Sequence, residues 1–233
     1  MTPRKVALVI GGTGILGRAI RLQLTASGWE VTGTARHRDT GARIVSLDLE
    51  DDESRRRFAD VVERLCPTLI IDAAGAYTEL GLDGDQEQIR TLLWVNSVAP
   101  AAALSSVLDM LSPGAIVFRI ESSLGEAPAI KAPVVSAAKA ADRALSAFVA
   151  EACRGRGLLF GSLVLSAVSE SLSGPETDEF RTHFGADPPS AEQVAEVVEK
   201  MIEIMRVSKL SGRLLLPGHG MLLDPLSGAV VPR

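Results

Sequence analysis

Short apolar runs rich in β-branched residues recur along the chain, and polar, helix-like segments separate them. Short runs of this composition are typical of β-strands. The pattern therefore predicts seven strands, at Val6–Ile10, Glu30–Thr34, Arg43–Leu47, Thr68–Asp72, Ala115–Ile120, Leu158–Leu165 and Arg213–Leu216.

Helical periodicity fills the segments between these runs, and strands that alternate with helices are typical of a parallel sheet. We expect an α/β fold, a Rossmann-type doubly wound parallel sheet of about seven strands with helices on both faces. No repeat or linker divides the chain, which predicts one domain over 1–233. The expected helices are Leu16–Ser27, Ser54–Leu65, Gln86–Leu111, Val134–Arg154 and Ala191–Val207.

One stretch, 171–189, is polar, contains Gly, Pro and Asp, and has only weak periodicity. A long connection of this kind is either a lid over a site or a surface excursion, and the sequence leaves both open.

Composition narrows the range of partners and compartments. The 233 residues carry a formal net charge of −5, with a pI near 5.3, which argues against a surface for nucleic acid or an anionic membrane. Cys66 and Cys153 are too few for a disulfide framework or a zinc site, which favours a reducing cytosol. The apolar run near the N-terminus is too short for a signal peptide, and Gly157–Val168 is shorter than the roughly 18–20 residues of a membrane span. We expect a soluble, cytoplasmic protein.

A glycine-rich loop joins the first expected strand to the first expected helix, with glycines at positions 11, 14 and 17. Glycine allows the sharp turn, the close approach of a pyrophosphate and tight packing of helix on strand, and the helix N-terminus then faces the phosphate charge. The alternative is a turn without a ligand. The loop residues expected to bind a dinucleotide are Gly11, Thr13, Gly14, Ile15 and Gly17.

The second expected strand should end beside the adenosine ribose of that dinucleotide. An acidic residue there favours NAD, whereas a cation accommodates the 2′-phosphate of NADP. The chain has Arg36 and Arg38 at this end and no carboxylate before Asp39. A guanidinium group can donate two parallel hydrogen bonds to two oxygens of one phosphate, so the sequence favours NADP (NADPH) over NAD. A solvated basic turn is the other interpretation.

Taken together, these motifs resemble the short-chain dehydrogenase/reductase family over the whole chain, and the Gly-x-x-Gly-x-x-Gly spacing is that of its extended and atypical branches. The resemblance implies one NAD(P)-binding domain. Asp48-Leu49 matches the pair beside the adenine, and Ala73-Ala74-Gly75 matches the adenine–ribose pocket. Asn96 matches the asparagine that anchors a catalytic water. Lys139 matches the lysine that binds the nicotinamide ribose, and Ser123, with Ser122 beside it, matches the active serine.

Two departures from the family pattern bear on the chemistry. Val135 stands four residues before Lys139, where the family has its proton-donating tyrosine, and the only tyrosine in the chain is Tyr77. The Pro-Gly that usually follows the sixth strand is also missing, because the chain reads Leu165-Ser166-Ala167-Val168-Ser169. A positioned general acid contributes about 10²–10⁴-fold, so carbonyl reduction requires another donor. Tyr77 is one candidate, and the others are Lys139, Lys131, Glu126 and His183.

Three functions remain open. The first is an NADPH-dependent reductase of a small organic substrate, either conjugated or a carbonyl compound, with a non-tyrosine or solvent proton source. The second is a non-redox cyclase, dehydratase or isomerase of small-molecule biosynthesis, in which Val135 would line an apolar pocket. The third is a non-catalytic NADP-binding regulator. The retention of both Ser123 and Lys139 favours the reductase, and nothing in the sequence names its substrate.

Small residues dominate the two helices around Asn96–Leu111 and Ser136–Cys153. Small side chains allow helices to approach closely, and the family pairs these two helices across a two-fold axis. The resemblance therefore implies a homodimer or homotetramer. Ordinary packing of the helices on the sheet is the alternative.

Overall fold

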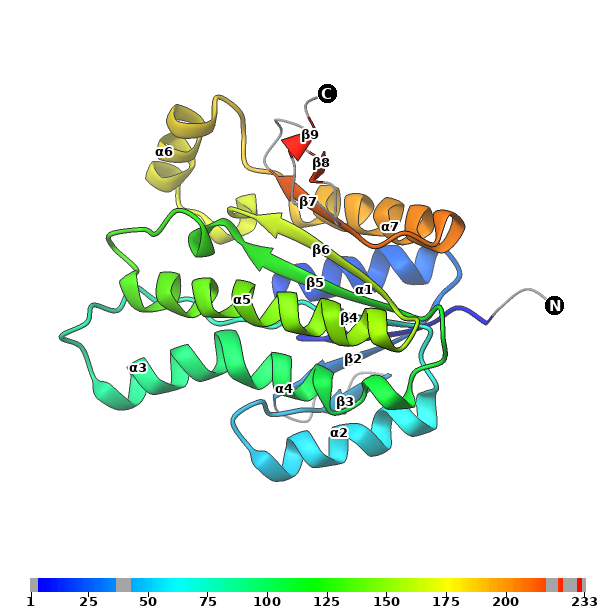
Figure 1. Cartoon of the computed structure of the whole chain (residues 1–233). Coiled ribbons are helices and arrows are strands. Elements are labelled where there is room, and N and C mark those ends of the chain that lie inside the picture. Colours follow the sequence, from blue (N-terminus) through cyan, green and yellow to red (C-terminus); the bar gives the residue numbers. More distant parts are fainter. Residues whose placement is uncertain (1–3, 37–42, 217–221, 224–229, 232–233) are drawn as a thin grey trace.

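The computed structural model describes residues 4–36, 43–216, 222–223 and 230–231, which form one nine-stranded sheet covered by helices (Figure 1). The strand order is β3-β2-β1-β4-β5-β6-β7-β8-β9. Strands β1 to β7 pair in parallel, and β8 and β9 extend the sheet antiparallel. Their bounds are β1 Val6–Ile10, β2 Glu30–Ala35, β3 Ile44–Ser46, β4 Leu69–Asp72, β5 Ile116–Ser122, β6 Leu159–Leu165, β7 Gly212–Leu216, β8 Leu222–Leu223 and β9 Val230–Val231.

Helices cover both faces of the sheet, as expected for a doubly wound fold. Helices α1 (Ile15–Ala26) and α7 (Ala191–Ser208) pack on one face, where their apolar residues join those of β1, β4, β5 and β6. Helices α2 (Asp52–Leu65), α4 (Ala99–Ser105) and α5 (Pro133–Gly155) pack on the other face (Figure 1). The central strands β1, β4 and β6 are buried along their whole length, which explains their continuous apolar sequences.

The long helix expected at Gln86–Leu111 is present but irregular. It comprises α3 (Gln86–Leu93), a π turn at Trp94–Val98, α4 and a 3₁₀ turn at Leu108–Met110. Pro100 has no amide hydrogen to donate to the carbonyl four residues earlier, and the side chain of Asn96 donates to the Leu92 carbonyl at 3.0 Å. The wider turn therefore lies where the ordinary helical hydrogen bonds are interrupted.

This same stretch, Gln86–Met110, is long and apolar enough to cross a membrane by length and composition alone, and 61% of its most apolar window is buried inside the protein. Buried core helices have the same composition, because they too are surrounded by apolar side chains.

The structure confirms the fold class and all seven expected strands, with end shifts of one or two residues at most of them. It adds β8, β9 and α6 (Gly174–Phe184), which the sequence analysis did not predict as elements. Helix α6 lies inside the 171–189 segment and projects from the sheet beyond the ends of β5 and β6 (Figure 1). Whether this segment acts as a lid stays a prediction.

Candidate active site

A cleft of about 230 Å³ opens where the carboxyl ends of the central strands meet. This edge is where ligands bind in doubly wound sheets. Three segments and three single residues line it: Ala73–Gly75 after β4, Ile120–Ser122 at the end of β5, Leu165–Val168 at the end of β6, Leu16 of α1, Lys139 of α5 and Ser171.

The loop that follows β1 is shaped by its glycines. Gly11 has a φ of +72°, and a Cβ there would lie 2.8 Å from the Cα of Ala74. A Cβ on Gly17 would collide with the Gly11 carbonyl oxygen. The Gly11 amide donates to the Thr34 hydroxyl at 3.1 Å, which ties the loop to β2. The sequence motif therefore brings β1, β4 and α1 into close contact, as its spacing predicts.

The N-terminus of α1 can accept an anion. Its N-cap residue is Gly14, which has no side-chain cap, and the first turn of the helix contains no acidic residue. Thr13 and Ile15 flank this position, and the Ile15 side chain is exposed. Uncapped amide groups and the helix dipole favour a phosphate at this position.

The hydroxyl of Ser166 is a second polar group of the cleft that a cofactor could contact. Its oxygen is buried at the cleft and has no hydrogen-bond partner among the residues that the structure describes. Buried hydroxyls are normally paired, so a polar group in the cleft would complete this one. Both features fit a bound dinucleotide. Its pyrophosphate would lie at the N-terminus of α1, and its nicotinamide carboxamide would lie near the end of β6.

The adenosine side of the site contains a competing ion pair. Arg36 follows β2, and its Nη2 lies 3.2 Å from an oxygen of Glu50. A 2′-phosphate would therefore have to displace or share this carboxylate. The second cation that the sequence suggested, Arg38, lies outside the described residues.

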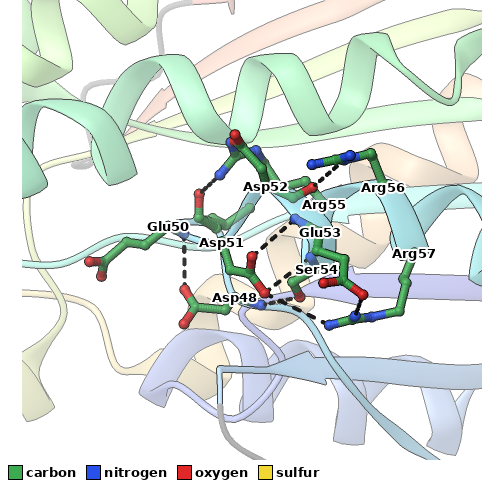
Figure 2. Close-up of polar contacts among 10 residues, drawn as sticks. Asp48, Glu50, Asp51, Asp52, Glu53, Ser54, Arg55, Arg56 and Arg57 are labelled. Carbon is green, nitrogen blue, oxygen red and sulfur yellow. Dashed lines mark hydrogen bonds and ion pairs between the residues drawn. The ribbon is translucent and has the colours of Figure 1, made fainter.

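Asp48 and Leu49 lie just before α2, and each already makes a hydrogen bond there (Figure 2). One oxygen of Asp48 accepts the Glu50 amide at 2.9 Å, and Asp51 caps the helix by accepting two amides, from Glu53 and Ser54. The carbonyl of Leu49 accepts the Trp94 indole N–H at 3.2 Å. The other oxygen of Asp48 has no such bond in this turn, and its predicted contact with adenine stays a prediction.

Asn96 is positioned by the π turn and fixes the loop after β4. Its amide group exchanges two hydrogen bonds with the backbone of Ala76, at 3.0 and 2.9 Å, and also donates to Leu92. The residue is only 1% exposed. This arrangement supports the interpretation that Asn96 is a structural brace. The predicted role as a water anchor is not tested.

Lys139 and Ser122 lie together in the cleft. A Cβ on Gly75 would be 3.4 Å from the Lys139 ammonium nitrogen, which shows how closely the lysine approaches this loop. Ser122 lines the cleft and caps the following turn by accepting the Leu124 amide at 3.3 Å.

Ser123, which was expected to be the active serine, is not among the residues lining this cleft. It begins the 3₁₀ turn Ser123–Gly125, and its backbone carbonyl accepts the amides of Glu126 and Ala127. Which of the two serines contacts a substrate stays a prediction.

Val135 and Tyr77 both lie away from the cleft lining. Val135 is 1% exposed and belongs to a small apolar cluster with Leu92, Ala132 and Val134. Tyr77 is 60% exposed. Partial burial, with smaller effects of Glu79 and Glu176, raises the pKa of the Tyr77 phenol. The valine therefore acts as a core residue, in contrast to the suggestion that it lines an apolar pocket.

A buried charge network beneath the cleft was missed by the sequence analysis. Arg119 of β5 bonds to Asp72 at 3.0 and 3.2 Å, to Asp142 at 2.6 Å and to the Ser146 hydroxyl at 2.7 Å. These four side chains are at most 4% exposed. Asp72 also accepts the Ala74 amide at 3.2 Å, so the network joins the loop after β4 to the helix that carries Lys139. The sequence feature that could have predicted this network is Arg119 itself, a charged residue within the otherwise apolar run of β5.

Asp142 is the member of this network with the most perturbed acidity. Burial raises its pKa to about 6, and the positive charges of Arg119 and Lys139 oppose that rise. Removal from water disfavours a carboxylate more strongly here than the neighbouring cations favour it.

Glu121 is the second residue that the sequence analysis missed. It directly precedes the serine pair, it is 5% exposed, and it lines the cleft together with Ser122 and Lys139. A buried glutamate at a cleft is uncommon, because ionised carboxylates are rarely buried without charged or polar neighbours. The sequence feature that could have identified it is an acidic residue at the end of the apolar run of β5.

Comparison with known proteins agrees with this arrangement. The model of the short chain dehydrogenase family matches residues 5–176. This is most of the chain, so the protein belongs to that family. No curated protein matches the chain closely.

Solved structures show the same fold at low sequence identity. A short chain dehydrogenase family protein from Francisella tularensis has 16% identity and a TM-score of 0.79, with 91% of this chain and 96% of that one covered. A dehydrogenase/reductase from Sinorhizobium meliloti has 21% identity and a TM-score of 0.76, with 91% and 92% covered. A 4-hydroxyisoleucine dehydrogenase complexed with NADH has 16% identity and a TM-score of 0.79, with 92% and 98% covered.

Proposed function

We propose that this protein is an NADPH-dependent reductase of a small organic substrate, conjugated or carbonyl, whose proton comes from a source other than a tyrosine. The observation that carries the proposal is the cleft itself, which Ser122 and Lys139 both line beside the uncapped N-terminal end of α1. When bound, the reduced nicotinamide supplies the hydride. Neither Val135 nor Tyr77 is among the residues lining the cleft, which supports a different proton donor.

Three polar groups of the cleft have a role in this proposal. The Ser122 hydroxyl would orient the substrate oxygen, and Lys139 would bind the nicotinamide ribose. The unpaired Ser166 hydroxyl would donate to or accept from the carboxamide, in place of the missing Pro-Gly. Apolar walls from Leu16 and Val168 would exclude water from the reacting atoms.

The preference for NADPH rests on Arg36. Its guanidinium stands at the end of β2, where the 2′-phosphate of NADP would lie. The Arg36 guanidinium lies 3.2 Å from the carboxylate of Glu50, in an exposed ion pair. Binding would exchange this exposed ion pair, which contributes little, for a phosphate contact with more charge.

A homodimer, or a homotetramer of two such pairs, is part of the proposal. The exposed apolar side chains of Trp94, Val98 and Phe148 support it, because they lie on the two adjacent helical segments, η1 (Trp94–Val98) and α5. Size-exclusion chromatography with light scattering tests it. A Phe148→Glu variant should shift the mass towards the monomer.

The experiment that tests the cofactor is a calorimetric titration of the protein with NADPH and, separately, with NADH. We expect micromolar NADPH binding and weaker NADH binding. Arg36→Ala should weaken NADPH binding by about tenfold and leave NADH unchanged, since one exposed charge-assisted contact is lost. Arg154→Ala, at the distant end of α5, is the matched control, because this arginine is exposed and also ion-paired. Absence of binding by both nucleotides would overturn the reductase proposal.

A further inference from the structure

We propose that Asp142 is a positioning residue for the cofactor: through Arg119, its carboxylate ties the helix that carries Lys139 to the loop that follows β4. This inference rests on the proposed nucleotide binding, because Lys139 and that loop both line the cleft in which the dinucleotide would lie. It follows from the course of one buried chain of hydrogen bonds.

The face of α5 that meets the sheet is polar near the cleft. Lys139, Asp142 and Ser146 are spaced by three and four residues, so they lie on one side of the helix. Asp142 and Ser146 are 3% and 4% exposed, although such polar residues are rarely buried without a partner. Both bind Arg119 of β5, at 2.6 and 2.7 Å. At this point an arginine, and not apolar packing alone, holds the helix to the sheet.

The same arginine is bound to the start of the loop after β4. It donates two hydrogen bonds to one oxygen of Asp72, at 3.0 and 3.2 Å, and the other oxygen of Asp72 accepts the Ala74 amide at 3.2 Å. Ala74 lines the cleft. Further along the loop, a Cβ on Gly75 would lie 3.4 Å from the ammonium nitrogen of Lys139. Helix α5 therefore approaches this loop at two points, through the arginine and through the lysine.

The charge of Asp142 strengthens this connection. A carboxylate accepts a charge-assisted hydrogen bond from a guanidinium group, which is about twice as strong as a neutral one. It also attracts the ammonium group of Lys139, one turn earlier on the same helix. Burial raises the pKa of Asp142 to about 6, although the positive charges of Arg119 and Lys139 oppose the rise. The side chain therefore changes near pH 6 between a charged and a neutral form of the same size, and only the charged form makes the full connection.

Few other charged groups face this carboxyl group. Those that act on Asp142 are Arg119, Asp72 and Lys139. The elements η1, η3 (Ser123–Gly125), α4 and β6 also pack against α5, and none of these four segments contains an ionisable side chain. The remaining charged residues on elements packed against α5 are Glu87 and Arg90 of α3, both exposed, and Glu121 of β5, which lines the cleft. Replacement of Asp142 by asparagine separates its titration from theirs.

The test is a calorimetric titration with NADP⁺ at pH 7.5 and at pH 5, because the reduced cofactor decomposes in acid. At pH 7.5 Asp142→Asn should bind NADP⁺ about three- to tenfold more weakly than the wild type, since a charge-assisted contact becomes a neutral one. At pH 5 the two proteins should agree within about twofold, because protonated aspartic acid and asparagine are both neutral. Titration of the 2′-phosphate affects both proteins alike and cancels in their ratio.

Two control variants separate the charge from the packing. Ser146→Ala removes another hydrogen bond of Arg119 without a change of charge, so any loss of affinity should be the same at both pH values. Asp109→Asn makes the matched replacement in an exposed ion pair with Arg156, which lies at the other end of α5. This variant should bind NADP⁺ like the wild type at both pH values.

The outcomes distinguish this inference from the proposed function. A ratio of affinities that is the same at both pH values, or an Asp142→Asn variant that binds as tightly as the wild type at pH 7.5, would overturn the role of Asp142. Nucleotide binding by the wild type would then still stand. Failure of the wild type to bind NADP⁺ would instead remove the reductase proposal.

A second measurement needs neither nucleotide nor a folded variant. In ¹⁵N-labelled wild-type protein, the NMR signal of the Ala74 amide should move with a midpoint near pH 6, because this amide is bound to the far end of the chain that begins at Asp142. The movement should disappear in Asp142→Asn. A wild-type signal that does not move between pH 5 and pH 7.5 would contradict the inference.

Discussion

Replacement of Arg119 by methionine should destabilise the protein more than any surface charge change. Arg119→Met preserves much of the side-chain volume but leaves Asp72 and Asp142 buried without their cation. Both carboxylates are at most 4% exposed, and the arginine makes four hydrogen bonds, three of them to these two groups. Removal of one partner from a buried ion pair costs about 3–5 kcal/mol. This is a large part of the roughly 5–15 kcal/mol that stabilises a typical domain.

Urea unfolding followed by circular dichroism measures this loss. At pH 7 we expect a destabilisation of about 3–5 kcal/mol, and less at pH 5, where the unpaired carboxyl groups take up protons. The exposed pair Arg154–Glu151 supplies the control, because Arg154→Met should cost well under about 1 kcal/mol. The triple change Asp72→Asn, Arg119→Met and Asp142→Asn should recover part of the loss. A loss below about 1 kcal/mol for Arg119→Met alone would refute the reasoning.

Three further predictions concern single residues. The pKa of Asp142 is raised from 3.8 to about 6, so its contribution to stability is present below pH 4 and is lost as the pH rises through 6. Urea unfolding across this range should show wild type losing stability relative to Asp142→Asn by at most about 3 kcal/mol. Glu50→Gln should strengthen NADPH binding a few-fold in calorimetry, because Arg36 loses its competing carboxylate, and should leave NADH unchanged. Val135→Tyr should destabilise the protein by about 1–3 kcal/mol in urea unfolding, because its site is already filled.

Different results would contradict each of these expectations. Parallel stability curves for wild type and Asp142→Asn between pH 4 and pH 6 would show that Asp142 has an ordinary pKa. If Glu50→Gln strengthened the binding of NADPH and NADH equally, Arg36 would not be the residue that contacts the 2′-phosphate. A Val135→Tyr variant as stable as the wild type would show that the apolar cluster around residue 135 has spare volume.

The sequence predicted the central strands well because their apolar runs reflect burial on both faces, as in β1 and β4. It did not predict α6, because the amphipathic pattern of this helix is weak. The helix begins with a capping box between Ser173 and Glu176. Strands β8 and β9 have two residues each, too short to leave a periodic signal.

The site was predictable where a backbone motif defines it and less so where side-chain direction does. The glycine loop joins β1 to α1 and Lys139 lines the cleft, and the binding roles of both stay predictions. Ser122 lines the cleft and Ser123 does not, and the role of either serine stays a prediction. The pairing of Arg119 with Asp72 and Asp142 joins residues far apart in the chain, and only the fold brings them together.

The two outer strands of the sheet bear on aggregation. An exposed strand edge offers unpaired amide and carbonyl groups to other chains, and short edges limit this risk. Among the described residues, one edge of the sheet is β3, with three residues, and the other is β9, with two. In the five-residue strand β7, Arg213 and Leu214 pair with β8. Truncation before β8 would therefore open a longer edge and favour the growth of intermolecular sheets during expression or storage.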